Sequence, residues 1–133
     1  MPAAALSIRV PAEADQMARV RTEVAEYARG LGMSAVAVDD ARTIVTEACG
    51  NSIKHAYGDS PDGLLEVSAT TEDGELCLVV RDFGTGIGPR STSLPSLHAG
   101  LSIIGALSNS LRLSSCRGGG TELEARLPLS AAA

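Results

Sequence analysis

The sequence is poor in aromatic residues, in cysteine and in long apolar segments. Its 133 residues include two tyrosines, one phenylalanine and no tryptophan, so we expect a core built mainly from Val, Leu, Ile and Ala. Cys49, Cys77 and Cys116 form no CxxC pair, and the two histidines add no zinc-binding spacing. Two of the three cysteines lie in apolar segments, which predicts buried free thiols in a reducing compartment.

Two further absences narrow the function classes. The net charge of −5 argues against a general nucleic-acid-binding protein, which needs a basic surface to neutralise phosphates. No apolar run is long enough to cross a bilayer, and the N-terminus lacks the basic and apolar regions of a signal peptide. We therefore predict a cytoplasmic protein, with no membrane partner and no direct nucleic-acid partner. The length predicts one domain, residues 1–133, with one core.

Periodicity predicts the order of the secondary structure elements. The sequence indicates a strand at 6–10, helices at 12–31 and 35–56, and a hairpin of strands 65–70 and 76–81. After a loop at 90–99, it indicates a short helix from Gly100, a second hairpin with strands at 111–115 and 123–127, and a frayed tail from Pro128. Asp73-Gly74 is a typical hairpin turn. The strand at 76–81 is almost continuously apolar, which predicts a central strand covered on both faces.

Strands joined mostly by hairpins favour a mixed, largely antiparallel sheet. With the helices on one face of that sheet, the expected fold class is α+β, a two-layer sandwich. The stretch of residues 89–99 is rich in Ser and contains Pro95, and we expect it to form a lid; the tail at 129–133 is expected to be disordered.

The helix at 35–56 carries a row of polar side chains. At about 100° per residue, Glu47, Asn51 and Lys54 fall on one face, within roughly 60° of one another. The opposite, apolar stripe consists of Val38, Ala41, Val45, Ala48, Cys49, Ser52 and Ala56. Asn is a mediocre residue inside a helix, so its position favours a functional role, although a solvated polar face is an equally good reading of this helix alone.

Two glycine-containing segments add to this pattern. Asp82 ends the central strand and opens a run with glycine at 84, 86 and 88, which leaves backbone accessible to a ligand. A carboxylate there could accept a hydrogen bond from a ligand amine. Gly100 is predicted at the N-terminus of an apolar helix, where free N–H groups suit phosphate oxygens. Read alone, either segment could be an ordinary turn or helix start.

Together these segments resemble the GHKL ATPases, the gyrase, histidine kinase and MutL type with the Bergerat fold. Glu47-xxx-Asn51-xx-Lys54-His55 resembles the N box, the run from Asp82 to Gly88 resembles the first glycine box, Gly100-Leu101-Ser102-Ile103-Ile104 the second, and Gly119-Gly120-Thr121 the closing Gly-Thr. The resemblance covers nearly the whole chain. The small size makes it most similar to the stand-alone anti-sigma-factor serine kinases of bacteria.

The resemblance implies a role for each matching residue. Asn51 would ligate Mg²⁺, Glu47 would be the general base or position the acceptor hydroxyl, and Asp82 would bind the adenine amino group of ATP. The remaining implied nucleotide contacts are Gly84, Gly86, Ile87 and Gly88 around the base and ribose, Gly100 and Leu101 at the phosphates, Thr121 near the adenine, and Lys54 and His55 at the phosphates or the rim, with a structural role for His55 equally open.

The implied function is an ATP-dependent protein serine/threonine kinase that acts as an anti-sigma factor. Its implied partners are an anti-anti-sigma (STAS-type) substrate protein and a sigma factor, and the resemblance also admits a homodimer. One departure stands in the second glycine box, where His98 replaces the usual first glycine. It favours the first alternative, a regulator that binds ATP or ADP without transferring phosphate. The second alternative is an interaction protein with a degenerate pocket.

Overall fold

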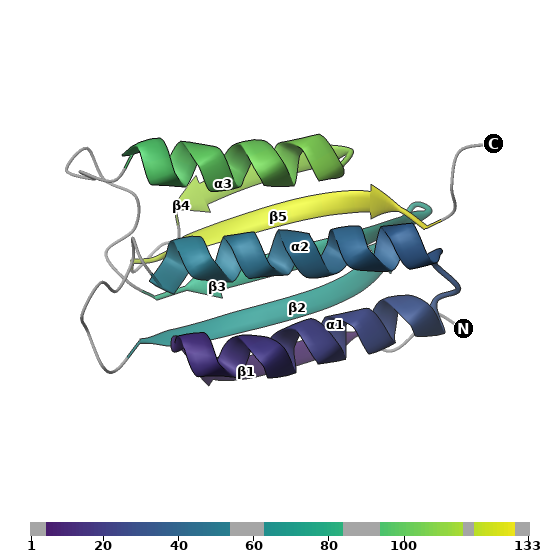
Figure 1. Cartoon of the computed structure of the whole chain (residues 1–133), viewed down its shortest axis with the longest axis horizontal. Helices are drawn as coiled ribbons and strands as arrows, with labels where there is room; N and C mark the ends of the chain where they lie inside the picture. Colours follow the sequence, from purple (N-terminus) through teal and green to yellow (C-terminus); the bar gives the residue numbers. More distant parts are fainter. Residues whose placement is uncertain (1–4, 54–62, 84–93, 116–118, 130–133) are drawn as a thin grey trace.

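The computed structural model describes the backbone of residues 5–53, 63–83, 94–115 and 119–129, and the side chains of these residues except 94–100. Its elements are β1 (Leu6–Pro11), a 3₁₀ turn η1 (Ala14–Gln16), α1 (Met17–Gly30), α2 (Ala35–Ser52), β2 (Leu64–Glu72), β3 (Glu75–Asp82), α3 (Leu94–Leu107), β4 (Ser110–Ser115) and β5 (Thr121–Pro128). Figure 1 shows the helices lying side by side along the sheet, with α2 between α1 and α3.

The strands form one five-stranded sheet in the order β1-β2-β3-β5-β4. Each of its pairings is antiparallel, so the predicted sheet is confirmed and its mixed character is not seen in the described strands. The β2–β3 hairpin turns at Asp73 and Gly74, whose φ angles are 51° and 76°. Two consecutive positive φ angles match the twist of the strands, which is why Asp-Gly predicts this turn.

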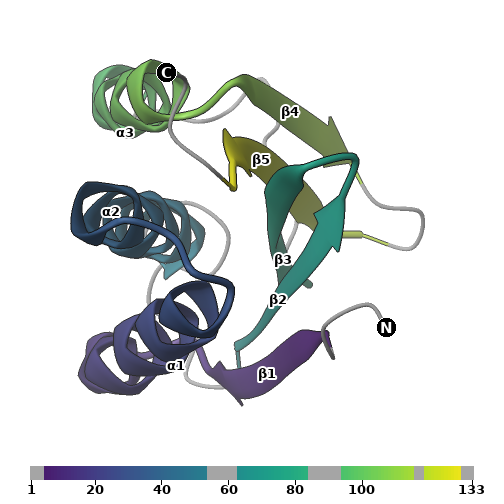
Figure 2. The ribbon, with the colours of Figure 1, turned by 90° about the vertical axis from the view of Figure 1, so that its right-hand side faces the viewer.

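The helices cover one face of the sheet, as Figure 2 shows in end view. This confirms the two-layer α+β prediction. The core between the layers contains Val20 and Val24 of α1 and Ile44 and Val45 of α2, all fully buried. Ser34 caps α2, since its Oγ accepts a hydrogen bond from the N–H of Ala37 at 3.1 Å.

Three predicted boundaries are wrong, those near Ala12, Ala99 and Pro128. Ala12 does not begin a helix; its N–H donates to Gly63 O at 2.9 Å, so the chain there still follows the sheet. The loop expected up to Ala99 ends at Leu94, where α3 starts. Pro95 is the second residue of α3, a position where the missing N–H costs no helical hydrogen bond. The predicted lid at 89–99 therefore overlaps α3, and residues 89–93 lie outside the described part.

The C-terminal boundary also differs from the prediction. β5 continues through Pro128, and the N–H of Leu129 donates to Gly74 O at 3.0 Å. Leu129 is partly buried against the core. The predicted frayed tail thus begins too early, and residues 130–133 lie outside the described part. The predicted helix at 35–56 is described as far as Ile53.

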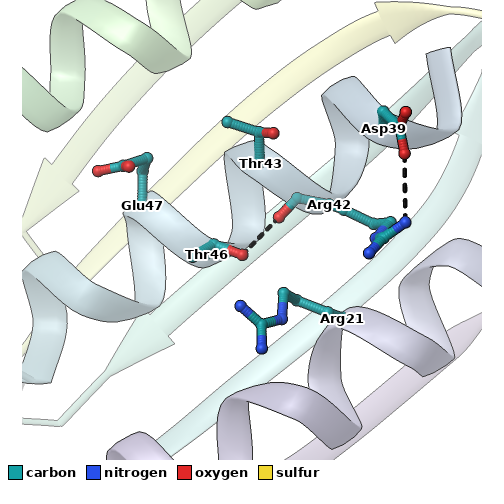
Figure 3. Close-up of a pocket in the computed structure, with 6 residues that line it drawn as sticks. All are labelled: Arg21, Asp39, Arg42, Thr43, Thr46 and Glu47. Atoms are coloured by element: carbon teal, nitrogen blue, oxygen red, sulfur yellow. Dashed lines mark hydrogen bonds and ion pairs between the residues drawn. The ribbon is translucent and has the colours of Figure 1, made fainter. Parts of the chain in front are cut away.

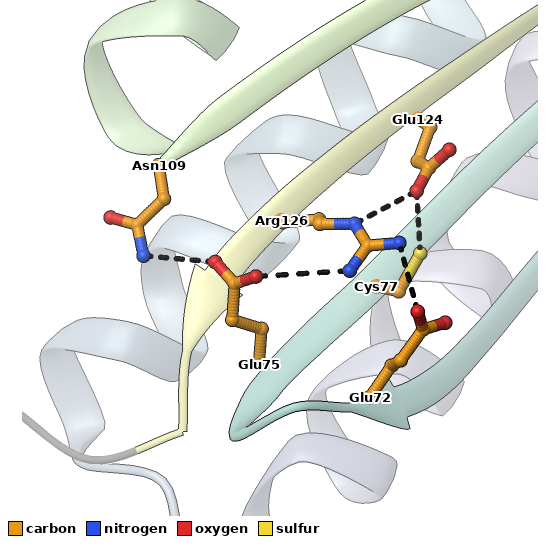
Figure 4. A network of polar contacts seen from close by, with 6 residues as sticks. All are labelled: Glu72, Glu75, Cys77, Asn109, Glu124 and Arg126. Carbon is orange, nitrogen blue, oxygen red and sulfur yellow. Dashed lines mark hydrogen bonds and ion pairs between the residues drawn. The ribbon is translucent and has the colours of Figure 1, made fainter.

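The face of the sheet opposite the helices carries a charged network rather than a second apolar cover. Arg126 Nε donates to Glu124 at 2.9 Å, and its guanidinium lies 3.7 Å from Glu72 and 3.8 Å from Glu75 (Figure 4). The Cys77 thiol donates to Glu124 at 3.2 Å beneath this network. β3 is therefore central in the sheet, as predicted, but the helices cover only one of its faces.

The described cysteines are free and buried. Burial raises the pKa of the Cys49 thiol to about 12. Burial and the hydrogen bond to Glu124 raise the pKa of Cys77 to about 11. Both thiols are therefore protonated and unreactive at neutral pH. Cys116 lies outside the described residues.

Within the part of the chain that the structure describes, no helix is long and apolar enough to cross a membrane.

The burial of α2 yields a test with a control on the same helix. Ile44 is fully buried, so Ile44→Ala should lower the free energy of unfolding by about 2–5 kcal/mol. Val36 is 72% exposed, and Val36→Ala should change it by less than about 0.5 kcal/mol. Urea denaturation measures both values. Equal effects of the two substitutions would contradict the packing of α2 described here.

Candidate nucleotide-binding site

The carboxylate of Asp82, at the end of β3, makes hydrogen bonds with the last residue of α2 and the first residue of β5. Asp82 is the last residue of β3 and is 3% exposed. Its Oδ1 accepts a hydrogen bond from the N–H of Thr121, the first residue of β5, at 3.0 Å. Its Oδ2 accepts a hydrogen bond from the hydroxyl of Ser52, the last residue of α2, at 3.1 Å. The predicted site residue Asp82 therefore lies at a hydrogen-bonded junction of α2, β3 and β5, which is called the Asp82 junction below, and not in an isolated turn.

Ser52 is the functional candidate that sequence reasoning missed. Its position by helical periodicity placed it on the apolar stripe of α2, and the structure confirms that orientation toward the sheet. At the end of that stripe, however, the neighbour is the Asp82 carboxylate, 30 positions away in sequence. The sequence does contain a signal for this contact: a hydroxyl at a core-facing position, directly after Asn51, needs a hydrogen-bond partner once it is buried.

The turn before β5 brings its backbone onto Asp82. Gly120 has a φ of +97°, a conformation that L side chains rarely adopt. A Cβ atom at Gly120 would overlap the carbonyl oxygen of Asp82 and come within 3.0 Å of Phe83 Cα. The glycine is therefore required for close approach, which agrees with the predicted Gly-Thr motif. Thr121 itself is 7% exposed.

Two polar atoms near this junction are buried without a partner in the described part of the chain. They are the Oγ1 of Thr121 and the Nδ2 of Asn51. Thr121 adjoins Asp82 through its backbone N–H, and Asn51 precedes Ser52. Unsatisfied buried polar atoms cost free energy, so their presence at one end of α2 points to a site that a polar ligand completes.

Glu47 lies one turn before Asn51 on α2, as the helical row requires. It lines a hollow of about 440 Å³ on the outside of α1 and α2 (Figure 3). Arg21 extends from α1 toward α2 in this hollow, and Arg42 pairs with Asp39 at 3.2 Å. The structure thus places Glu47 and Asn51 on successive turns, both half-buried, with Glu47 at the hollow and Asn51 directly before Ser52 of the Asp82 junction.

The other predicted contacts fall into two groups. Lys54, His55, Gly84, Gly86, Ile87 and Gly88 lie outside the described residues. Gly100 and Leu101 belong to α3, which starts at Leu94, so the prediction that Gly100 begins a helix is wrong. A residue at that depth in an α-helix donates its N–H to the carbonyl four residues earlier. The side chain of Leu101 packs against the core.

The residues present fit a purine nucleotide at its base end. Asp82 supplies a buried acceptor for an exocyclic amine, and Thr121 supplies a hydroxyl whose hydrogen bond is unmade within the described structure. The carboxamide of Asn51 provides an oxygen of the type that Mg²⁺ accepts. In the described part of the chain, no three His, Cys, Asp or Glu side chains cluster to hold a metal. A cation there would need ligand phosphates and water, which is how Mg²⁺ commonly binds in nucleotide sites.

Comparison with known proteins identifies the family of this chain. The histidine kinase-like ATPase domain family matches residues 10–127. The chain is similar to the anti-sigma F factor of Clostridium beijerinckii, with 28% identity over 128 residues, covering 89% of this chain and 90% of the relative. The anti-sigma F factor of Clostridium novyi is 30% identical over 113 residues, covering 77% and 79%.

A solved structure shows the same fold. A crystal structure of the RsbU and RsbW domains of a Mycobacterium tuberculosis protein superposes with a TM-score of 0.73 and 22% identity. The match covers 96% of this chain and 33% of that longer one, so this chain spans about a third of its length.

The close approach of Gly120 to Asp82 is testable through stability. Gly120→Ala should lower the free energy of unfolding by about 2 kcal/mol or more, because it adds both backbone strain and an overlap. Gly30→Ala is the matched control. Gly30 ends α1 with nothing within 4 Å of an added Cβ, so that change should be neutral or stabilise by up to about 1 kcal/mol. Urea denaturation of the two variants decides; a neutral Gly120→Ala contradicts the described turn.

Proposed function

This chain belongs to the histidine kinase-like ATPase domain family, and from that premise we propose that it is an ATP-dependent protein serine/threonine kinase acting as an anti-sigma factor. Its substrate in this proposal is an anti-anti-sigma (STAS-type) protein, and its second partner is a sigma factor that it holds inactive. The name of the relatives, anti-sigma F factor, supports the partner class. The proposal places the protein in the cytoplasm, where both ATP and sigma factors are found.

The observation that carries the nucleotide assignment is the buried Asp82 junction. Its carboxylate is fixed by donors from α2 and β5 and is buried beside a Thr121 hydroxyl that lacks a partner in the described structure. An acceptor held in this way is complementary to the amino group of adenine. The family match supports nucleotide binding by this chain, and the hydrogen bonds at the junction support Asp82 as the acceptor for the base.

The remaining roles follow from the chemistry of each group. When bound, Mg·ATP supplies the phosphoryl group and the charge neutralisation that transfer requires. Asn51 would hold the cation through its side-chain oxygen. Glu47 would orient the acceptor hydroxyl or take its proton, since it lies one turn before Asn51 and lines a surface hollow that a protein substrate can approach. Lys54, His55, the glycines of residues 84–88, Ile87, Gly100 and Leu101 are proposed as nucleotide contacts from the family resemblance.

One observation favours the alternative of a nucleotide-binding regulator that transfers nothing. α3 begins at Leu94, so Gly100 and Leu101 lie within a helix rather than at its start. Helical N–H groups at that depth are already paired, and a phosphate would find fewer donors there than at a helix N-terminus. Transfer to an acceptor protein separates the two functions.

Nucleotide binding is the first property to test. A ligand that binds the native state at a hundred times its dissociation constant adds about 2.7 kcal/mol to the free energy of unfolding. We expect Mg·ATP to raise the melting temperature of the wild type. Asp82→Asn replaces the acceptor with an amide of the same shape, so ATP should not raise the melting temperature of this variant above its own ligand-free value. Calorimetry measures both, with EDTA and ADP as further conditions.

No shift for the wild type with any nucleotide would reject the site and leave the interaction-protein reading. A shift of equal size in Asp82→Asn would reject Asp82 as the base-binding group while keeping nucleotide binding.

Phosphoryl transfer tests Glu47 and Asn51 separately. Glu47→Gln should keep the ATP-induced rise in melting temperature and slow transfer by about 10²–10⁴-fold, the usual contribution of a general base. Asn51→Ala should lose the Mg²⁺-dependent part of binding and therefore transfer. Thr43→Val is the control, because Thr43 lines the same hollow one turn from Glu47 and has no proposed role. The measurement for each variant is the amount of labelled phosphate that is incorporated into a panel of purified STAS-type proteins.

Transfer at the wild-type rate in Glu47→Gln would exclude Glu47 as the base. Binding of ATP by the wild type without labelling of any acceptor in the panel would favour the non-transferring regulator.

A further inference from the structure

The hydrogen bond between Ser52 and Asp82 controls the direction in which the carboxylate faces. A carboxylate turns easily about its terminal torsion, which is broad and has no staggered wells. Here each oxygen has its own donor, Ser52 Oγ on Oδ2 at 3.1 Å and Thr121 N on Oδ1 at 3.0 Å. Two donors on different oxygens, from elements on different sides, hold the plane of the group. The donor from Thr121 is backbone, so among the described hydrogen bonds of Asp82 the one from Ser52 is the side-chain contribution to holding this plane.

The chemistry of the two donors also fixes what the carboxylate offers to a ligand. A serine hydroxyl can donate or accept, but an ionised carboxylate only accepts, so the Ser52 hydroxyl donates the hydrogen bond to Asp82. The group is thereby kept as an oriented acceptor. A carboxylate oxygen has two lone-pair directions, so one that accepts from the protein can also accept from a ligand. A ligand amine at this point is attracted, whereas a ligand carbonyl oxygen is repelled.

We propose that Ser52 is a positioning residue that determines the base specificity of the nucleotide site. By holding Asp82 in one orientation, it aligns the carboxylate with the 6-amino group of adenine and sharpens rejection of purines that carry an oxygen at position 6. This inference rests on the proposed function, because it requires that the site take a purine nucleotide. The proposal adds Ser52, on the apolar face of α2, to the site residues Glu47 and Asn51 on the polar face of the same helix.

The experiment measures the affinity of three nucleotides for three variants by titration calorimetry. ATP carries an amine at position 6, inosine triphosphate an oxygen, and purine riboside triphosphate hydrogen. The wild type should bind ATP best. Ser52→Ala should lose about tenfold in ATP affinity and change little for purine riboside triphosphate, because the lost interaction involves the amine. Ser52→Thr keeps the hydroxyl and should restore the ATP preference.

Thr46→Val is the matched control on the same helix. The Thr46 hydroxyl donates to Arg42 O at 2.7 Å, within the helix and away from Asp82. Its removal should leave all three affinities at the wild-type value. This separates loss of the bond to Asp82 from a general effect of deleting a hydroxyl in α2.

The outcomes distinguish this inference from its premise. A wild type that binds no nucleotide overturns the proposed function and this inference with it. A wild type that binds ATP but does not prefer it over inosine triphosphate overturns the inference alone. So does a Ser52→Ala variant that keeps the wild-type preference, or one that loses equal affinity for all three nucleotides, since equal loss indicates a merely structural role.

Discussion

A buried carboxylate is costly unless donors surround it, and this cost organises the end of the molecule where the candidate site lies. Asp82 is 3% exposed, and the two described donors on its oxygens come from the last residue of α2 and the first residue of β5. If either element moved, the buried Asp82 side chain would lose one of these hydrogen bonds. The position of α2 along the sheet is thus fixed at one end by core packing of Val38, Ala41 and Ile44, and at the other by this polar junction.

The two layers explain why the junction is accessible to chemistry at all. The helices on one face bury apolar side chains of β1, β2, β3 and β5, and the opposite face carries the charged network around Arg126. In the described part of the chain, buried side-chain atoms without a partner occur at Tyr27 and Arg81 as well as at the Asp82 junction. The two at the junction lie where α2 ends and β5 begins, beside the Asp82 carboxylate. Thr121 Oγ1 and Asn51 Nδ2 are both at that end, and both lack a partner within the described structure.

Sequence periodicity predicted the parts of the fold that depend on near neighbours. The apolar stripe of α2, the Asp73-Gly74 turn and the antiparallel hairpins follow from local spacing, and the structure confirms them. What the sequence could not supply were contacts between distant segments. The bond from Ser52 to Asp82, the pairing of Leu129 with Gly74 and the cover of Cys77 by Glu124 each join residues whose patterns are unrelated. Pro95 was misread for a different reason, since proline marks a loop and a first helical turn equally well.

The two ends of the candidate site differ in how far the described structure supports them. Its base end is formed by residues on the ends of α2, β3 and β5, and these residues already make the hydrogen bonds that hold Asp82. Its expected phosphate end depends on α3, where the helix starts before Gly100 and uses the N–H groups that a phosphate would need. In the proposed site, a nucleotide would meet an acceptor that is already held in place at its base, whereas the N–H groups of α3 near Gly100 are already paired within the helix. Because the base is common to ATP and ADP, contact with Asp82 would not by itself distinguish the two nucleotides, and discrimination would have to come from residues that contact the phosphates.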